Sequence, residues 1–196
     1  IPSNICEQVQ INAAEKSGAN IIPEVKDVYF PTESQTYSYR QIAKGMTTNI
    51  ITDVIYPYET KATTQLCIKR DENIKTTGVT CELSSTEPVI QDPAPIVVSN
   101  LKKDIIPGIG NEITLLVTFD LQNTYGEILD KNKISQSITD EDRVIDVNLN
   151  LKGITNSFTC NPNKDGKILF KENQKTLKCE AIINLNQDYI VNPLEI

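Results

Sequence analysis

Residues 112–121 read EITLLVTFDL, and apolar side chains occupy every second position of this stretch. Such alternation is typical of a β-strand that buries one face and exposes the other. Residues 143–151, RVIDVNLNL, repeat the pattern, with isoleucine, valine and leucine on one face and aspartate and asparagine on the other. Both stretches therefore predict half-buried strands.

Shorter runs with strand character flank these two stretches, and Gly, Pro, Asn and Asp separate them. We expect further strands at residues 25–30, 36–42, 49–58, 63–69, 78–83, 95–101, 126–130, 167–170 and 188–192. Short strands joined by turns predict an all-β fold, an antiparallel sandwich. Only residues 4–18 stay open: Asn4 and Glu7 have capping-box spacing for a helix, whereas Ile5, Val9 and Ile11 fit a strand.

A proline-rich segment divides the sequence near its middle. Residues 88–95 contain Pro88, Pro93 and Pro95, and proline is excluded from central strands because it has no N–H to donate. We therefore expect a linker at 88–95 between two tandem β-sandwich domains, residues 1–87 and residues 96–196.

Composition excludes several classes of function. The chain has 26 acidic and 19 basic residues and a net charge of -7, the wrong sign for binding nucleic acid. It has no histidine, so the commonest general base and metal ligand is missing. We expect a noncatalytic protein, not an enzyme, with no catalytic residues and no cofactor. No apolar run is long enough for a membrane-spanning helix. Because no signal-like segment precedes Ile1, we expect a mature product or a piece of one.

Four of the five cysteines are predicted to form two local disulfides, Cys67 with Cys81 and Cys160 with Cys179. Cys160 and Cys179 each share a face with core-type residues of their predicted strands, so both sulfurs point into one core. Cys67 instead lies opposite Leu66 and Ile68, so its bridge requires a bulge or an edge position. Each disulfide would stabilise the fold by roughly 3 kcal/mol in the chain-entropy model.

The disulfides indicate an oxidising, extracellular setting, whereas free buried thiols in a cytosolic protein are the alternative. Cys6 is left over, and it either pairs with a thiol outside this chain or stays free. No cysteine or histidine spacing fits a structural zinc site, so no metal is expected there.

Two further motifs have a functional and a structural interpretation. Residues 161–172, NPNKDGKILFKE, match the spacing of a calcium loop at Asn161, Asn163, Asp165 and Glu172, although a hairpin turn explains them better. Tyr56 and Tyr58, in YPYET, could anchor a partner, but a place in a sandwich core or strand edge is the favoured interpretation.

The stretch NIITDVIYPYETKATTQLCI, a second cysteine, DPAPIVVSNLKKDI and EITLLVTFDLQN together resemble a class of secreted or membrane-anchored archaeal surface proteins, chiefly from small-genome archaea. The similarity covers roughly residues 45–185 and includes a late cysteine pair matching Cys160 and Cys179. It implies β-sandwich ectodomains with immunoglobulin-like domains at the cell surface, behind an N-terminal membrane segment that this sequence lacks, and it offers no activity to carry over. The Gly-rich turn common in that class after the LLVTF-like strand is replaced here by LQNTYGE.

Taken with that resemblance, the sequence predicts a noncatalytic extracellular structural protein, a subunit of an archaeal cell-surface filament or layer. The expected partner is a second copy of the chain, in a homopolymer, or another surface protein. Residues 11–22 and 190–196 are the segments expected to add to a neighbour's sheet edge. The alternative is an adhesion ectodomain that binds carbohydrate or protein through its loops.

Overall fold

The computed structural model describes residues 9–12, 15–17, 20–22, 24–29, 52, 54–76, 81–130, 139–155, 157–161 and 167–196. The chain divides into two compact units, Ile1–Thr52 and Asp53–Ile196. The described residues form an all-β structure, and every strand pair among them is antiparallel.

In the first unit, β1 (Glu15–Ser17) and β2 (Asn20–Ile22) form a hairpin in which Glu15 lies opposite Ile22. Residues 9–12 belong to no helix or strand. Neither alternative for 4–18 is found at Val9 and Ile11, and the strand in this stretch is instead Glu15–Ser17; Asn4, Ile5, Cys6 and Glu7 lie outside the described residues.

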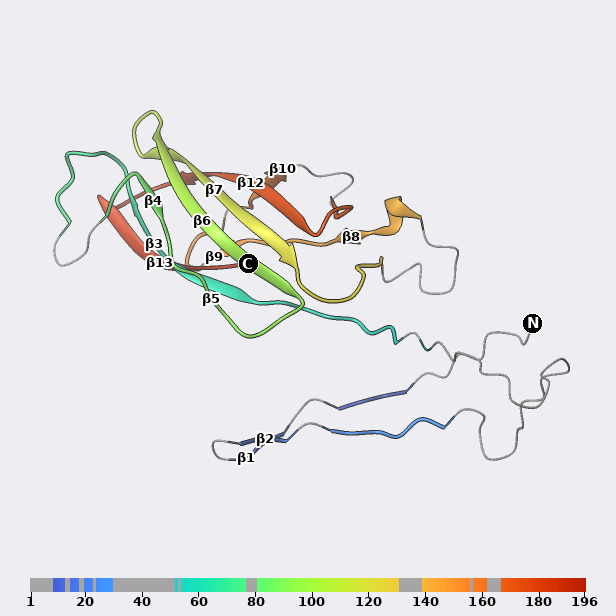
Figure 1. Ribbon diagram of the computed structural model, residues 1–196. Coiled ribbons are helices and arrows are strands. Elements are labelled where there is room, and N and C mark those ends of the chain that lie inside the picture. The colour runs from blue at the N-terminus through green and yellow to red at the C-terminus, as the bar shows by residue number, and fades with distance from the viewer. Residues whose placement is uncertain are drawn as a thin grey trace, which may run out of the picture. The chain divides into compact units, whose positions relative to one another are not determined.

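The second unit contains a five-stranded sheet in the order β10-β12-β7-β6-β4 (Figure 1). Its strands are β4 (Ser84–Thr86), β6 (Ile96–Pro107), β7 (Glu112–Asn123), β10 (Thr159–Asn161) and β12 (Gln174–Asn184). In β7 and β12 every second residue is apolar and buried, and β6 follows the same alternation on either side of one irregularity. β7, the strand expected from EITLLVTFDL, pairs with β12 and β6 over nearly its whole length.

A four-stranded sheet in the order β5-β3-β13-β9 forms the second layer. Its strands are β3 (Ala62–Lys69), β5 (Ile90–Gln91), β9 (Asn150–Leu151) and β13 (Tyr189–Glu195). A two-stranded ribbon joins β8 (Val144–Ile145) to β11 (Ile168–Leu169), and the 3₁₀ turn η1 (Asp140–Asp142) precedes β8. The stretch 143–151 is thus two short strands rather than the one expected.

The two sheets bury a common hydrophobic core. Phe119 and Leu115 of β7 and Leu177 of β12 are fully buried, as are Leu66 of β3 and Leu194 of β13. All five belong to one cluster of buried side chains. Two antiparallel sheets that share one apolar core are consistent with the expected β-sandwich.

A bulge in β6 reverses which face of the strand is buried. The pairing of β6 with β7 shifts register between Ser99 and Lys102, and Asn100 has a positive φ of 51°. Asparagine is one of few residues that adopt this left-handed conformation readily. Before the bulge Val98 faces the core, and after it the odd-numbered residues do, beginning with Leu101. The bulge therefore turns Lys103 inward.

The division of the chain differs from the expected one. Sequence placed a linker at 88–95 between domains 1–87 and 96–196, but Asp53–Ile196 is one compact unit. The proline-rich segment runs within this unit: β5, inside it, pairs with β3 at Ala62 and Thr63. β3, from before the expected linker, pairs over seven residues with β13, from the end of the chain.

Several expected strands are absent from the described residues. Residues 25–29, 54–58 and 126–130 belong to no strand, and 36–42 lie outside the described part. The C-terminal segment, expected to add to a neighbour's sheet edge, forms β13 of its own sheet, between β3 and β9.

Candidate functional site

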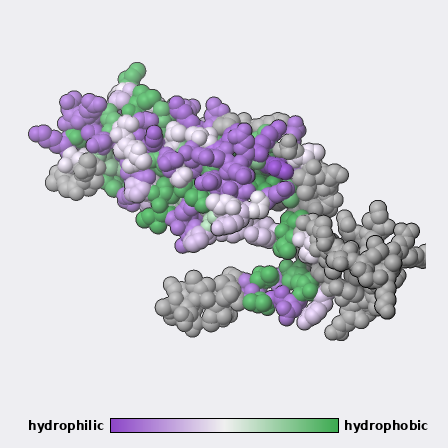
Figure 2. All heavy atoms as spheres, in the orientation of Figure 1, coloured by the Kyte–Doolittle hydropathy of each residue, from purple (hydrophilic) through white to green (hydrophobic). Residues whose placement is uncertain are grey.

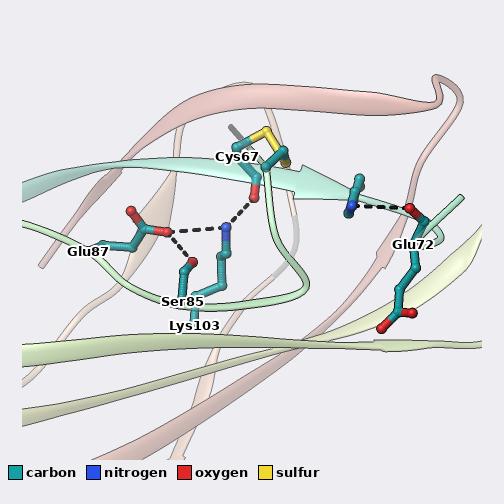
Figure 3. The surroundings of a disulfide bond; sticks show 7 residues. Cys67, Glu72, Ser85, Glu87 and Lys103 are labelled. Atoms are coloured by element: carbon teal, nitrogen blue, oxygen red, sulfur yellow. Dashed lines mark hydrogen bonds and ion pairs between the residues drawn. A yellow bond between two sulfur atoms is a disulfide. The ribbon is translucent and has the colours of Figure 1, made fainter. Parts of the chain in front are cut away.

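The most unusual buried group of the sandwich is the ammonium of Lys103, whose residue is only 1% exposed. Its Nζ lies 3.1 Å from Oε1 of Glu87 and donates a hydrogen bond of 2.6 Å to the carbonyl oxygen of Cys67 (Figure 3). The hydroxyl of Ser85 donates to the same Glu87 oxygen at 2.5 Å. The cation thus has one charged and one neutral acceptor in a site closed to water.

This cluster joins the two sheets. Lys103 comes from β6, Ser85 from β4 and Cys67 from β3, and Glu87 follows β4 directly. Removing one member of a buried ion pair leaves the other charge uncompensated, which costs about 3–5 kcal/mol. These contacts of Lys103 and Glu87 all lie within the sandwich, so the cluster works as a clamp between the layers.

The disulfide between Cys67 and Cys81 lies beside this clamp. β5 pairs with β3 only at Ala62 and Thr63, so beyond them this side of β3 is an edge. Thr64 donates from its hydroxyl to the carbonyl of Pro88 at 2.7 Å, and the Cys67 carbonyl accepts from the clamp on the same side. The bridge therefore uses the edge position that sequence alternation requires.

The second disulfide joins Cys160 of β10 to Cys179 of β12, which are direct partners in the register of the sheet. Both residues are buried in the shared core, as their alternation predicted. The sulfur chemistry of this unit is consequently structural, and both predicted pairings are present.

The candidate calcium loop lies only partly in the described residues. Asn161 ends β10 and Glu172 follows β11, and both are exposed, while Asn163 and Asp165 lie outside the described part. Among the residues that the structure describes, no three Cys, Asp or Glu side chains gather as metal ligands would.

Tyr56 and Tyr58 lie on an extended segment that precedes β3. Their rings stack edge to face with centroids 6.2 Å apart, and the Tyr58 hydroxyl donates to the Pro93 carbonyl at 3.4 Å. Val54 is 79% exposed, Tyr56 61% and Tyr58 53%, and Ile55 is also exposed. The preferred interpretation, a place in the core or a strand edge, is therefore wrong for these two tyrosines.

A groove of about 680 Å³ lies along β13. Its lining includes Gly153, Asp188 and the four residues Tyr189–Asn192. β9 leaves β13 here: the Ile154 amide donates to the Leu151 carbonyl at 3.2 Å, and Gly153 turns the chain with a φ of 78°. Glycine suits this third turn position because it adopts positive φ without strain.

The side of β13 that faces this groove has no strand partner among the described residues from Tyr189 to Asn192. β9 pairs with β13 only at Leu194 and Glu195, and the Lys152 amide donates to the Pro193 carbonyl at 3.0 Å. An unpaired edge offers backbone N–H and C=O groups to another strand.

On the face drawn in Figure 2, hydrophilic side chains predominate and apolar ones form separate patches. A hydrogen-bonded row crosses the outer face of the five-stranded sheet: Asp120 accepts from Thr176 at 2.5 Å and from Asn100 at 2.8 Å. These two bonds, with the bond from Thr176 as the larger cause, hold the pKa of the Asp120 carboxyl below its ordinary value.

In a separate pair, the hydrogen bond to Asp130 raises the pKa of the Lys167 ammonium.

Sequence reasoning missed the clamp and the row. The signal for the clamp was present in β6, where the apolar core positions change from an even-numbered residue, Val98, to odd-numbered ones, Leu101 and Ile105. That change marks a bulge, places Lys103 on the buried face and predicts a carboxylate partner for it.

Compared with known proteins, the chain matches no family model, no curated protein and no solved structure. No helix in the described residues is long and apolar enough to cross a membrane.

Proposed function

We propose that this chain is a noncatalytic extracellular structural protein, a subunit of a cell-surface filament or layer. The observation that carries the proposal is the exposed apolar segment 54–58, which belongs to none of the strands in the described residues. Contiguous apolar side chains at a surface mark a contact site, and a subunit that binds its neighbours requires such a contact.

The two disulfides support an extracellular site of action. Each closes a short loop, 14 and 19 residues apart in sequence, and such bridges persist in oxidising compartments. With a net charge of -7, copies of the chain repel one another over most of their surface. An uncharged segment is where two copies can make contact without that repulsion.

Negative-stain electron microscopy of the unreduced protein at high concentration tests the proposal. Regular fibres or sheets are expected, together with a concentration-dependent rise in mass by light scattering. Dispersed single particles at every concentration would contradict it.

The second candidate is an adhesion or binding ectodomain, and the exposed Tyr56–Tyr58 pair favours it. Exposed tyrosines present apolar faces and hydroxyl groups that suit sugars and proteins. A glycan array probed with the chain and with Tyr56→Ala separates the two candidates: glycan binding that the substitution abolishes supports the ectodomain.

A further inference from the structure

We propose that residues 54–58 of one copy add as a strand to the open edge of β13 in a second copy, head to tail. This inference rests on the proposed assembly function and specifies its contact. The occupant of the groove is thus a named segment of the same chain.

The direction of the backbone groups in β13 can be read from its partners. The Cys67 carbonyl points away from β13. The Arg70 amide donates to the Asp188 carbonyl, and Ala62 and Ile196 exchange both backbone bonds, so the even-numbered residues of β3 direct their backbone groups to β13 and the odd-numbered ones direct theirs away. Opposed residues of an antiparallel pair both point inward or both outward, so Val191, the partner of Cys67, also points outward. By alternation Tyr189 and Pro193 do so too, and the bond from Lys152 to the Pro193 carbonyl agrees.

The groove edge therefore offers the N–H and C=O groups of Tyr189 and Val191. Pro193 has no N–H, and its carbonyl already accepts from Lys152, so the available edge ends there. This length suits a donor of about five residues.

The segment 54–58, VIYPY, has the properties of such a donor. In an extended chain the N–H groups of Val54, Tyr56 and Tyr58 point to one side, and Ile55 and Pro57 point to the other. Because Pro57 lacks an N–H, the segment can pair fully on one side only. Proline occurs in edge strands, where the side that lacks the N–H faces solvent. The donor segment would therefore form the edge strand of the extended sheet.

Charge allows this contact between two acidic copies. The donor has no charged residue. Asp188 is the one carboxylate lining the groove, and it pairs with Arg70 of its own chain at 3.4 Å. The remaining lining residues are uncharged, so neither partner buries an unpaired charge.

Donor and acceptor are different surfaces, so the contact is heterologous. Such a contact repeats from copy to copy and forms an open filament unless its rotation closes a ring. Its short length predicts weak pairwise affinity, with assembly at high protein concentration.

Proline substitutions test the contact. Tyr56→Pro removes a donor N–H on the pairing side and should abolish filaments, whereas the matched Ile55→Pro removes an N–H on the Pro57 side and should keep them. Val191→Pro should also abolish filaments, because it removes an outward N–H of the acceptor. Melting temperatures within a few degrees of the parent protein show that each variant folds.

A mixture of the two defective variants gives the sharpest result. Tyr56→Pro keeps an intact acceptor and Val191→Pro an intact donor, so each alone should be monomeric and their mixture should form dimers and nothing larger by analytical ultracentrifugation. Filaments that survive both Tyr56→Pro and Val191→Pro would overturn this inference and leave the assembly function standing. Absence of filaments in the parent protein would overturn both.

Discussion

The two sheets of the sandwich are built differently. In the five-stranded sheet, β6, β7 and β12 have 12, 12 and 11 residues and pair over most of their length. In the four-stranded sheet only β3 and β13 form a long pair, and their outer neighbours β5 and β9 have two residues each, so long stretches of both are unpaired among the described residues. One layer is built on three long strands, and the other on a single long pair.

Truncating one core side chain in each sheet has the largest expected effects on stability. Phe119→Ala, in β7, should destabilise the sandwich by about 4 kcal/mol, because it leaves a cavity in the fully buried core. Ile190→Ala, in β13, should cost only about 1 kcal/mol, since Ile190 is partly buried at the edge of the core. Urea unfolding measures both, and equal losses would contradict the different burial of these two side chains.

The clamp between the layers gives the next largest effect. Lys103→Met should cost about 3 kcal/mol, because the Glu87 carboxylate loses its cation while partly buried. The neighbouring exposed residue supplies the control, and Lys102→Met should change stability by less than about 0.5 kcal/mol.

The double variant Lys103→Met with Glu87→Gln sharpens this result. It should lose less stability than Lys103→Met alone, since no unpaired charge then remains at the clamp. A larger loss in the double variant would argue against an ion pair as the source of the effect.

The bulge that directs Lys103 inward is tested at Asn100. Asn100→Ala should be less stable than Asn100→Gly by about 1 kcal/mol, because alanine resists the left-handed conformation that glycine adopts freely. Both variants lose the hydrogen bond to Asp120, so the difference isolates the backbone. Thermal unfolding provides the measurement, and equal midpoints would contradict it.

The smallest effect concerns the outer face of the five-stranded sheet. The pKa of the Asp120 carboxyl is lowered in the folded protein, so its ionised form favours folding above the unfolded pKa, near 4. This contribution is lost as pH falls through the lower folded pKa. Asp120→Asn should therefore flatten the stability curve below about pH 4, and Thr176→Val should do so in part. An unchanged acid limb in both variants would contradict the role of the row.

The sequence predicted β7, whose apolar residues alternate without a break, because burial on one face leaves a period of two. It also predicted the first part of β13, from a short apolar run, and both disulfides. It misplaced the domain boundary, since prolines at 88–95 limit hydrogen bonding locally but do not reveal the pairing of β3 with β13. It also missed the clamp, because a single bulge at Asn100 changes the face of every later residue in β6.

The pairing of β3 with β13 also affects the order of folding. Arg70, just beyond β3, pairs with Asp188, just before β13, across 118 residues of sequence. A ribosome or a secretion channel releases the chain from its N-terminal side. β3 therefore has no β13 to pair with until the rest of the sandwich has emerged. Contacts this distant in sequence slow folding, and the apolar face of β3 stays uncovered meanwhile. Such a chain benefits from a chaperone that holds it until its last strand arrives.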